Sequence, residues 1–311
     1  MHAAQLQQAR PGTVAPLREA VYGDVDEQAA ALSGWNQSYL QLQAGGFSGR
    51  IRRIDLGGMR LFIEDLQASV LQTGCLAEGV LALGVPLRSS APGLFCGRPS
   101  GEDALHVFSG RSGFEFRCAG DHQMLGIELT PTEPGLNFGS QAGLRNAAPH
   151  ALRSLLLSVF ETAQARPQSL AEAAVRARMS DALLDRISVL SDAPADEDAL
   201  PDSHWLWVSR ARELIAADLQ QPPTVAELCE QLGTSRRSLQ LAFQRVLGVS
   251  PLAYLRAARL GAARRSLKTA ASVTEAATQL GFWHFGHFAK DYQAMFGELP
   301  SQTHRRHQLP D

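Results

Sequence analysis

The sequence has few features that would place the protein in a membrane or in an oxidising compartment. No apolar run approaches the ~18 residues that a membrane-spanning helix needs, and the start of the chain (MHAAQLQQARPGTVAP) lacks the apolar core of a signal peptide. The four cysteines form no CxxC pair, which disfavours a disulfide or zinc framework. We therefore expect a cytoplasmic protein with no membrane partner and with free, buried thiols at Cys75, Cys96, Cys118 and Cys229.

The sequence also has little net charge. Its 29 lysines and arginines stand against 31 aspartates and glutamates, a net charge of −2 in 311 residues. That length suggests two domains, and the average hides a difference between them. Residues 204–311 contain 13 basic and 8 acidic side chains, a net of +5, whereas residues 1–203 contain 16 and 23, a net of −7. This asymmetry is typical of a protein with one domain facing a polyanion, although chance variation in surface charge would look the same.

The first half of the chain has short apolar segments broken by Gly or Pro every 8 to 12 residues. Several of them alternate apolar and polar residues, the pattern of half-buried strands. Evenly spaced short strands indicate a sandwich or a small barrel, and we expect a cupin-like β-barrel. The predicted strands are 38–44, 50–56, 59–66, 80–87, 105–108, 113–118 and 124–129.

A small barrel can hold one ligand in its mouth. The barrel region has two histidines, His106 and His122, without the close His pair that an iron-binding cupin uses. We therefore expect no metal and no cofactor, and we interpret both histidines as surface or locally hydrogen-bonded groups. The aromatic residues either fill the core or line a ligand pocket, and the candidates are Trp35, Phe95, Phe108, Phe114 and Phe116.

After the predicted strands, the apolar period changes to about 3.6 residues, which predicts amphipathic helices at about 150–164 and 169–190. Pro167 separates them, because a proline disfavours helix at the preceding residue. Their apolar stripes either pack on the barrel or pair with a second subunit, and we favour pairing in a homodimer. The domain 1–190 then ends at a linker, 191–203 (SDAPADEDALPDS).

The second half of the chain, 204–311, contains a predicted helix-turn-helix. A first helix covers 205–219, and Thr224 with Glu227 forms a T-x-x-E capping box before the next. Gly233 ends that helix, and Ser235 begins another that stops at Gly248. In a helix-turn-helix the second helix enters the major groove of DNA, its N-terminal residues against the bases.

The helical phases of the second helix place apolar side chains inward at Leu239, Phe243, Val246 and Leu247. Arginine can pair with guanine and glutamine with adenine, so an outward face of these residues suits base reading, although it also suits a solvated surface. We take as DNA-binding candidates Ser235, Arg236, Arg237, Gln240 and Gln244.

This unit is repeated. The segment VTEAATQLG, which begins at Val273, resembles VAELCEQLG at an offset of 48 to 49 residues, and Gly297 corresponds to Gly248. A predicted helix over 251–269 joins the copies and would be about 28 Å long at 1.5 Å per residue. Successive major grooves on one face of DNA repeat every ~34 Å. The joining helix can therefore place both reading helices on one duplex.

The pattern over 206–307 resembles the AraC/XylS family of transcription regulators. The motifs that carry the resemblance are TVAEL, GTSRRSLQLAF, GVSP, GFWHFGHFAKDY and FGELP. The resemblance implies two helix-turn-helix units and an N-terminal domain that binds an effector and often dimerises. It also places base contacts at Arg237, Gln240 and Leu241, of which Leu241 departs from the basic residue that many members have.

In the second copy the resemblance puts bulky aromatic residues and a glycine, Phe285 and Gly286 among them, where polar readers are usual. This copy is therefore expected to contact phosphates more than bases. Its DNA-binding candidates are Trp283, His284, His287 and Lys290. The GFWHFGHFAKDY ending is similar to a subgroup of ethanolamine- and amine-responsive regulators, so an amine or amino alcohol is the implied effector.

Together these features predict an α+β protein that regulates transcription as a DNA-binding activator and is not an enzyme. The expected partners are double-stranded DNA, RNA polymerase, a small-molecule effector and a second copy of the chain. A ligand-independent dimeric regulator stays open as an alternative. An enzyme with a DNA-binding tail, either a cupin or a methyl acceptor, is disfavoured because Cys118 precedes Ala-Gly-Asp rather than a Cys-His-Arg type of sequence.

Overall fold

The computed structural model describes residues 17–109, 113–130, 136, 138, 142–145, 149–191 and 203–308. These residues divide into two compact units, one built on β-sheets and one helical, with the segments Tyr39–Phe47 and Ala68–Leu71 grouped with the helical unit. Within the described residues, no helix is long and apolar enough to cross a membrane. The predicted linker falls almost wholly outside the described residues.

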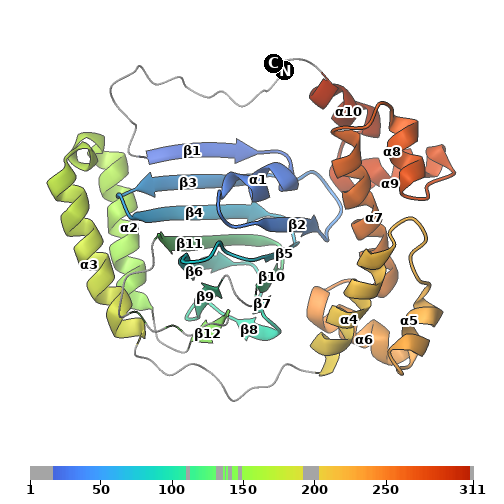
Figure 1. Ribbon diagram of the computed structural model, residues 1–311, viewed down its shortest axis with the longest axis horizontal. Helices are drawn as coiled ribbons and strands as arrows, with labels where there is room; N and C mark the ends of the chain where they lie inside the picture. Colours follow the sequence, from blue (N-terminus) through green and yellow to red (C-terminus); the bar gives the residue numbers. More distant parts are fainter. Residues whose placement is uncertain are drawn as a thin grey trace. The chain divides into compact units, whose positions relative to one another are not determined.

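The N-terminal half contains two antiparallel sheets (Figure 1). The first has the strand order β1 (Leu17–Tyr22), β3 (Gly49–Asp55), β4 (Met59–Gln67), β11 (Asp121–Leu129), β6 (Leu81–Ser89), β9 (Leu105–Ser109) and β12 (Gly143–Arg145). The second has the order β2 (Gln37–Gln41), β5 (Val70–Gly74), β10 (Phe114–Cys118), β7 (Gly93–Phe95) and β8 (Arg98–Ser100).

The predicted cupin-like arrangement is confirmed, with the difference that the two sheets do not close into one ring. Every strand predicted from alternation is present. The short helix α1 (Val25–Ala31) and the strands β1, β5, β7, β8 and β12 were not predicted. Three of those strands have only three residues, too few to show a period of two.

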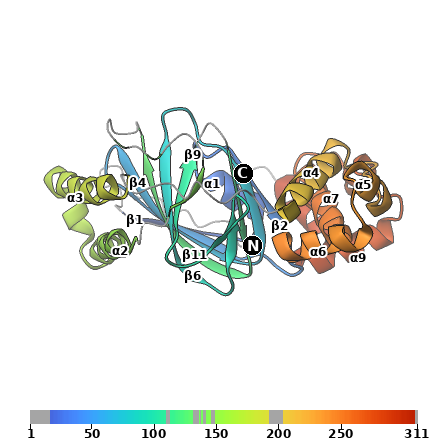
Figure 2. The same ribbon diagram turned by 90° about the horizontal axis from the view of Figure 1, so that it is seen from below.

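The central strand β11 has two different faces, because successive side chains of a strand point to opposite sides. On one face, Leu125, Ile127 and Leu129 join an apolar cluster with side chains of two helices, α2 (His150–Ala165) and α3 (Ala173–Ser191). Figure 2 shows these helices outside the seven-stranded sheet. On the other face, His122, Met124 and Glu128 are buried.

The apolar stripes of α2 and α3 pack on the sheet, the first of the two interpretations that the sequence allowed. Leu152, Leu156, Leu183 and Ile187 are each at most 1% exposed within the single chain. The prediction that one stripe is free to pair with a second subunit is therefore wrong for these side chains. The helices separate as predicted, at Arg166, with a short 3-10 turn η1 (Pro167–Ala171) before α3.

The helical unit begins with α4 (Ser203–Ala217), which precedes two units of the same design. Each unit has a short helix, a glycine turn and a longer helix: α5 (Val225–Gln231) and α6 (Arg236–Leu247), then α8 (Val273–Gln279) and α9 (Phe285–Phe296). The helix α7 (Pro251–Leu267) joins them, and α10 (Pro300–Gln308), which was not predicted, follows the second. The predicted α+β architecture is confirmed.

Local sequence explains where these helices begin and end. The Thr224 hydroxyl accepts from the Glu227 amide while the Glu227 carboxylate accepts from the Thr224 amide, which is the predicted capping box. The hydroxyl of Ser235 caps α6 in the same way. Gly248 and Gly297 end α6 and α9 with φ of 73° each, a left-handed conformation that favours glycine.

Candidate nucleic-acid interface

The helix α6 has one face in the core and one in solvent, as its sequence predicts. Leu239 and Phe243 are 0% exposed and hold the helix against the rest of its unit. Arg236, Arg237 and Gln240 lie on the exposed face, near the N-terminal end of the helix. Three guanidinium and amide groups on one solvent-facing side can donate several hydrogen bonds to an anionic or base-edge surface.

Two of the predicted contact residues have a structural task inside α6. The Ser235 hydroxyl accepts from the Ser238 amide at 3.0 Å and lies 2.9 Å from the Ser238 hydroxyl. The Gln244 side-chain amide donates to the Gly248 carbonyl oxygen at 3.1 Å, at the far end of the helix. Gln244 therefore stabilises the C-terminal end of the helix, whereas Arg236, Arg237 and Gln240 are exposed near its N-terminal end.

The helix α9 presents a different surface. Phe288 and Tyr292 are buried and anchor it. Trp283 and Phe285 are exposed, with 69% and 43% of their surface in solvent. The predicted contact residues His284, His287 and Lys290 are exposed as well. His284 occupies the N-cap position without a side-chain cap bond, unlike Ser235 in the first unit.

The helix α7 fixes the second unit through an arginine that was not among the predicted site residues. Arg259 donates to the Leu280 carbonyl oxygen at 2.7 and 3.2 Å, and its guanidinium lies 4.3 Å from the centre of the Phe282 ring. The Leu280 carbonyl belongs to the turn before α9. Arg259 thereby holds the turn that orients the second reading helix.

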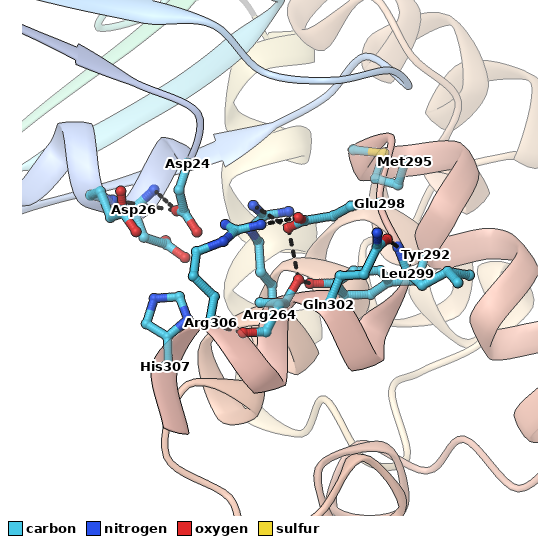
Figure 3. Close-up of polar contacts among 12 residues, drawn as sticks. Asp24, Asp26, Arg264, Tyr292, Met295, Glu298, Leu299, Gln302, Arg306 and His307 are labelled. Atoms are coloured by element: carbon cyan, nitrogen blue, oxygen red, sulfur yellow. Dashed lines mark hydrogen bonds and ion pairs between the residues drawn. The ribbon is translucent and has the colours of Figure 1, made fainter. Parts of the chain in front are cut away.

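A second cluster joins α7, α9 and α10 around Glu298 (Figure 3). Its carboxylate accepts from Arg264 at 2.9 Å, from Arg306, and from the Thr303 hydroxyl at 2.7 Å. Thr303 also lies 2.8 Å from the Tyr292 hydroxyl. Glu298 belongs to the FGELP motif, so a sequence signal for it existed.

The basic segment 304–307 is part of α10. His304 contacts the Ala270 carbonyl oxygen at 3.0 Å, and Arg306 pairs with Glu298. His307 contacts the Thr303 carbonyl oxygen at 3.0 Å. The segment is therefore an ordered helix, in which Arg305 is exposed and the Arg306 side chain is 48% exposed.

The predicted pocket aromatics meet between the two sheets of the N-terminal half, and all are at most 5% exposed. Trp35 packs edge-on against Phe108 and Phe114, with ring centres 4.8 and 5.6 Å apart. Phe95 lies 5.1 Å from Phe108 and 6.2 Å from Phe116. The five candidates therefore form one connected interior cluster.

Both histidines are buried in this aromatic interior: the expectation of a local hydrogen bond holds for His106, whereas His122 is neither at the surface nor hydrogen-bonded among the described residues. His106 is stacked on Phe95 at 4.4 Å, and its Nε2 atom lies 2.5 Å from the Ser100 hydroxyl. His122 lies 5.0 Å from Phe116, and neither of its ring nitrogens has a hydrogen-bond partner among the described residues. Burial lowers the pKa of His122 to about 4 and the pKa of His106 well below its ordinary value, so both are neutral at neutral pH.

Two buried carboxylates, neither of them predicted from the sequence, also face this interior. Glu64, 5% exposed, accepts from the side-chain amides of Gln28 at 3.0 Å and Gln72 at 3.1 Å. Glu128, 3% exposed, accepts from the Trp35 indole at 3.0 Å and from Arg60. The available signal was their position on the inward phase of alternating strands.

The cysteines are free thiols, but Cys118 alone among them is fully buried, and the other three are half-buried. Burial raises the pKa of the Cys96 thiol to about 11. Among the described residues there is no group of three or more His, Cys, Asp or Glu side chains that could hold a metal ion.

Comparisons with known proteins match the helical unit. A family model described as a helix-turn-helix domain matches residues 228–306. The chain is 41% identical over 102 residues to the probable thc operon regulatory protein of Rhodococcus erythropolis, and 38% identical over 104 residues to the XylDLEGF operon transcriptional activator 3 of Pseudomonas putida. Each match covers 32% of this chain and 31% of the relative. The chain thus spans about a third of the length of these curated relatives.

Among solved structures, the chain is similar to a probable AraC family transcriptional regulator from Rhodopseudomonas palustris CGA009. The identity is 40%, the match covers 33% of this chain and 99% of the other, and the TM-score is 0.32. The AraC-like transcriptional activator CuxR matches over 75% of this chain and 88% of its own, at 17% identity and a TM-score of 0.41.

Proposed function

Because the chain belongs to the AraC/XylS family, we propose that it is a sequence-specific DNA-binding regulator of transcription, an activator, rather than an enzyme. The observation that carries this proposal is the pair of capped helix-turn-helix units, each with a solvent-facing second helix. In the first unit that face is basic, because α6 contains three arginines and no acidic residue. Backbone phosphates bind such a face through charge, and guanine and adenine offer edges that arginine and glutamine read.

In this proposal Arg237 and Gln240 read bases, while Ser235 and Arg236 lie at the phosphate beside the start of α6. Gln244 supports the end of the helix. In the second unit His284, His287 and Lys290 contact phosphates. Acting on DNA places the protein in the cytoplasm, and activation requires a contact with RNA polymerase.

Selection of binding sites from a random duplex library by the full chain tests the DNA-binding proposal. We expect a defined sequence to be enriched, and its affinity to fall steeply as salt is raised, because bound phosphates release counterions. Uniform, sequence-independent binding, or no binding at low salt, contradicts the proposal.

For the N-terminal half we propose an effector site between the two sheets, lined by Trp35, Phe95, Phe108, Phe114 and Phe116. Glu64 supports the choice of an amine or amino alcohol, since a buried carboxylate in an interior that also contains aromatic rings suits a cationic ligand. The two buried histidines are neutral at neutral pH and do not repel a cation.

Calorimetry with a panel of primary amines and amino alcohols, and with the corresponding uncharged alcohols, tests the effector proposal. We expect amine binding by the native chain and its loss in Glu64→Gln. Glu19→Gln is the matched control, because the Glu19 side chain is 46% exposed and pairs with Arg50. Amine binding that survives in Glu64→Gln contradicts the site. If no amine binds while DNA selection succeeds, the ligand-independent dimeric regulator replaces this proposal, and sedimentation at several concentrations tests the homodimer.

A further inference from the structure

The two reading helices differ most at the positions where a reader would meet the bases. Aligned on the glycines that end them, Arg236 and Arg237 of α6 correspond to Phe285 and Gly286 of α9. The outward Gln240 corresponds to Ala289. The second unit therefore has the same backbone design as the first but lacks its hydrogen-bonding groups at these positions.

The aromatic residues that replace those groups face solvent. Trp283, two residues before α9, is 69% exposed and Phe285, the first residue of α9, is 43% exposed, whereas Phe288 and Tyr292 of α9 are 2% and 0% exposed. The core of the second unit thus contains Phe288 and Tyr292, while Trp283 and Phe285 remain exposed. Apolar surface of this size gains about 25 cal/mol for each Å² that a partner covers.

Gly286 follows the exposed Phe285 in the first turn of α9 and precedes His287. A Cβ atom there would meet nothing within 4 Å. Packing within the chain therefore does not require glycine, although glycine disfavours helix by up to about 1 kcal/mol relative to alanine. A missing side chain at an exposed helix position allows an outside surface to approach the backbone closely.

The charged residues near Trp283 and Phe285 in the sequence indicate what kind of partner surface approaches the helix. His284, His287 and Lys290 are the exposed polar neighbours, and Gly286, His287 and Lys290 share one helix face through their three- and four-residue spacing. Asp291, the acidic residue of α9, pairs with Arg256 of α7 at 3.7 Å. An apolar centre with a basic rim complements an anionic partner that has apolar groups between its charges.

Building on the DNA-binding proposal, we propose that the second unit reads thymine methyl groups. Trp283 and Phe285 lie against the C5-methyl groups of thymines in the major groove, Gly286 lets the helix approach, and His287 and Lys290 bind the flanking phosphates. The thymine methyl is the apolar group that the major groove presents. The two units then read one operator by different chemistry, hydrogen bonds in one half-site and apolar contact in the other.

Replacing thymine by uracil tests this proposal, because the exchange removes the methyl group and keeps the base pair. A binding site for the full chain is first selected from random duplexes. The half-site in which Arg237→Ala relaxes the base preference is then the one that the first unit binds. In the other half-site, replacing a contacted thymine by uracil should weaken binding about fourfold at each such position. The same exchange at base pairs read by Arg237 or Gln240 should change affinity less than twofold.

Two variants connect the effect to the named side chains. Trp283→Ala and Phe285→Ala should weaken binding and remove the sensitivity to uracil. Each variant already lacks the contact between aromatic ring and thymine methyl group, so removing the methyl group costs it nothing further. Val189→Ala is the matched control: Val189 is 68% exposed on α3 and should leave binding unchanged. Gly286→Ala should keep the fold and weaken binding.

Different experimental results contradict methyl reading by the second unit and DNA recognition by the whole chain. If no sequence is selected, DNA recognition itself is contradicted. If a site is selected with the expected salt dependence but uracil in the second half-site has no effect, DNA recognition stands and the methyl-reading inference is overturned. Normal DNA affinity with lost transcription activation in Trp283→Ala also overturns it, in favour of a protein partner for this surface.

Discussion

At the scale of single residues, the helical unit depends on one carboxylate with several partners. Glu298 accepts from Arg264, Arg306 and Thr303, and Arg264 is 3% exposed. Arg264 also lies over the Phe296 ring at 4.6 Å. A buried guanidinium without its carboxylate is costly, because the charge has lost water without gaining a counterion.

Glu298→Gln should therefore lower the free energy of unfolding by about 3 kcal/mol, measured by urea denaturation. Glu213→Gln is the matched control, because Glu213 and its partner Arg210 are 61% and 64% exposed. An exposed pair of this kind contributes about 0.5 kcal/mol. Equal losses in the two variants would show that Arg264 is not held by Glu298.

A buried histidine gives the N-terminal half a pH-dependent stability. His122 has a pKa of about 4 in the folded chain against 6.5 in the unfolded chain. Between these values the unfolded state binds a proton that the folded state does not. The free energy of unfolding consequently falls as pH falls, by about 1.4 kcal/mol per pH unit for one such group.

His122→Leu should reduce this loss of stability between about pH 6.5 and pH 4. Urea denaturation at several pH values, followed by the circular dichroism of the sheets, measures it. The difference in the free energy of unfolding between variant and native chain, taken at each pH, removes the contribution of the carboxylates that both proteins share. A slope unchanged by the substitution would mean that His122 is not held neutral in the fold.

At the scale of elements, the two helix-turn-helix units share a design but differ in how tightly their turns are packed. Gly233 and Gly281 occupy the corresponding turns with φ of 60° and 69°, where a side chain is disfavoured. A Cβ atom on Gly233 would meet nothing within 4 Å. On Gly281 it would lie 2.2 Å from the Gln220 carbonyl oxygen.

Gly233→Ala should thus destabilise the helical unit by about 1 kcal/mol, which is the conformational cost alone. Gly281→Ala should cost at least about 2 kcal/mol more, because backbone atoms must move apart. Thermal unfolding of the two variants compares them directly. Equal losses of stability in the two variants would contradict the difference in packing between the two turns.

At the scale of the whole molecule, charge is divided between the halves of the chain. Residues 204–311 have a net charge of +5 and residues 1–203 a net charge of −7. On the proposed function, this division directs the basic helical unit to DNA. An excess of five charges is small, so specific contacts must supply much of the discrimination between sequences.

Two substitutions separate charge from recognition. Lys290→Ala should weaken binding to all duplexes and reduce the slope of log affinity against log salt by about one. Arg237→Ala should cost about 1 to 3 kcal/mol and relax the preference at one base pair. Affinity measured on selected and random duplexes across a salt series distinguishes them, and each variant serves as the control for the other.

The sequence predicted the local features of the helical unit well. The capping box at Thr224, the cap at Ser235 and the stop at Gly248 each depend on residues within about four positions. The sequence missed contacts between distant residues, such as Gln28 with Glu64 and Arg264 with Glu298. It also interpreted His122 as a surface or locally hydrogen-bonded group, because a histidine in a strand has no local pattern that tells burial from exposure.

The sequence by itself therefore determined the family, the duplicated helix-turn-helix and a cupin-like half built from short strands, since caps, turns and hydrophobic periods act over a few residues. The tertiary structure decided which faces those elements bury. It packed the stripes of α2 and α3 on the sheet, gathered aromatics, histidines and carboxylates between the sheets, and left Trp283 and Phe285 outside. Burial is a property of surfaces that meet across long stretches of chain, and periodicity shows that a face is apolar without showing what covers it.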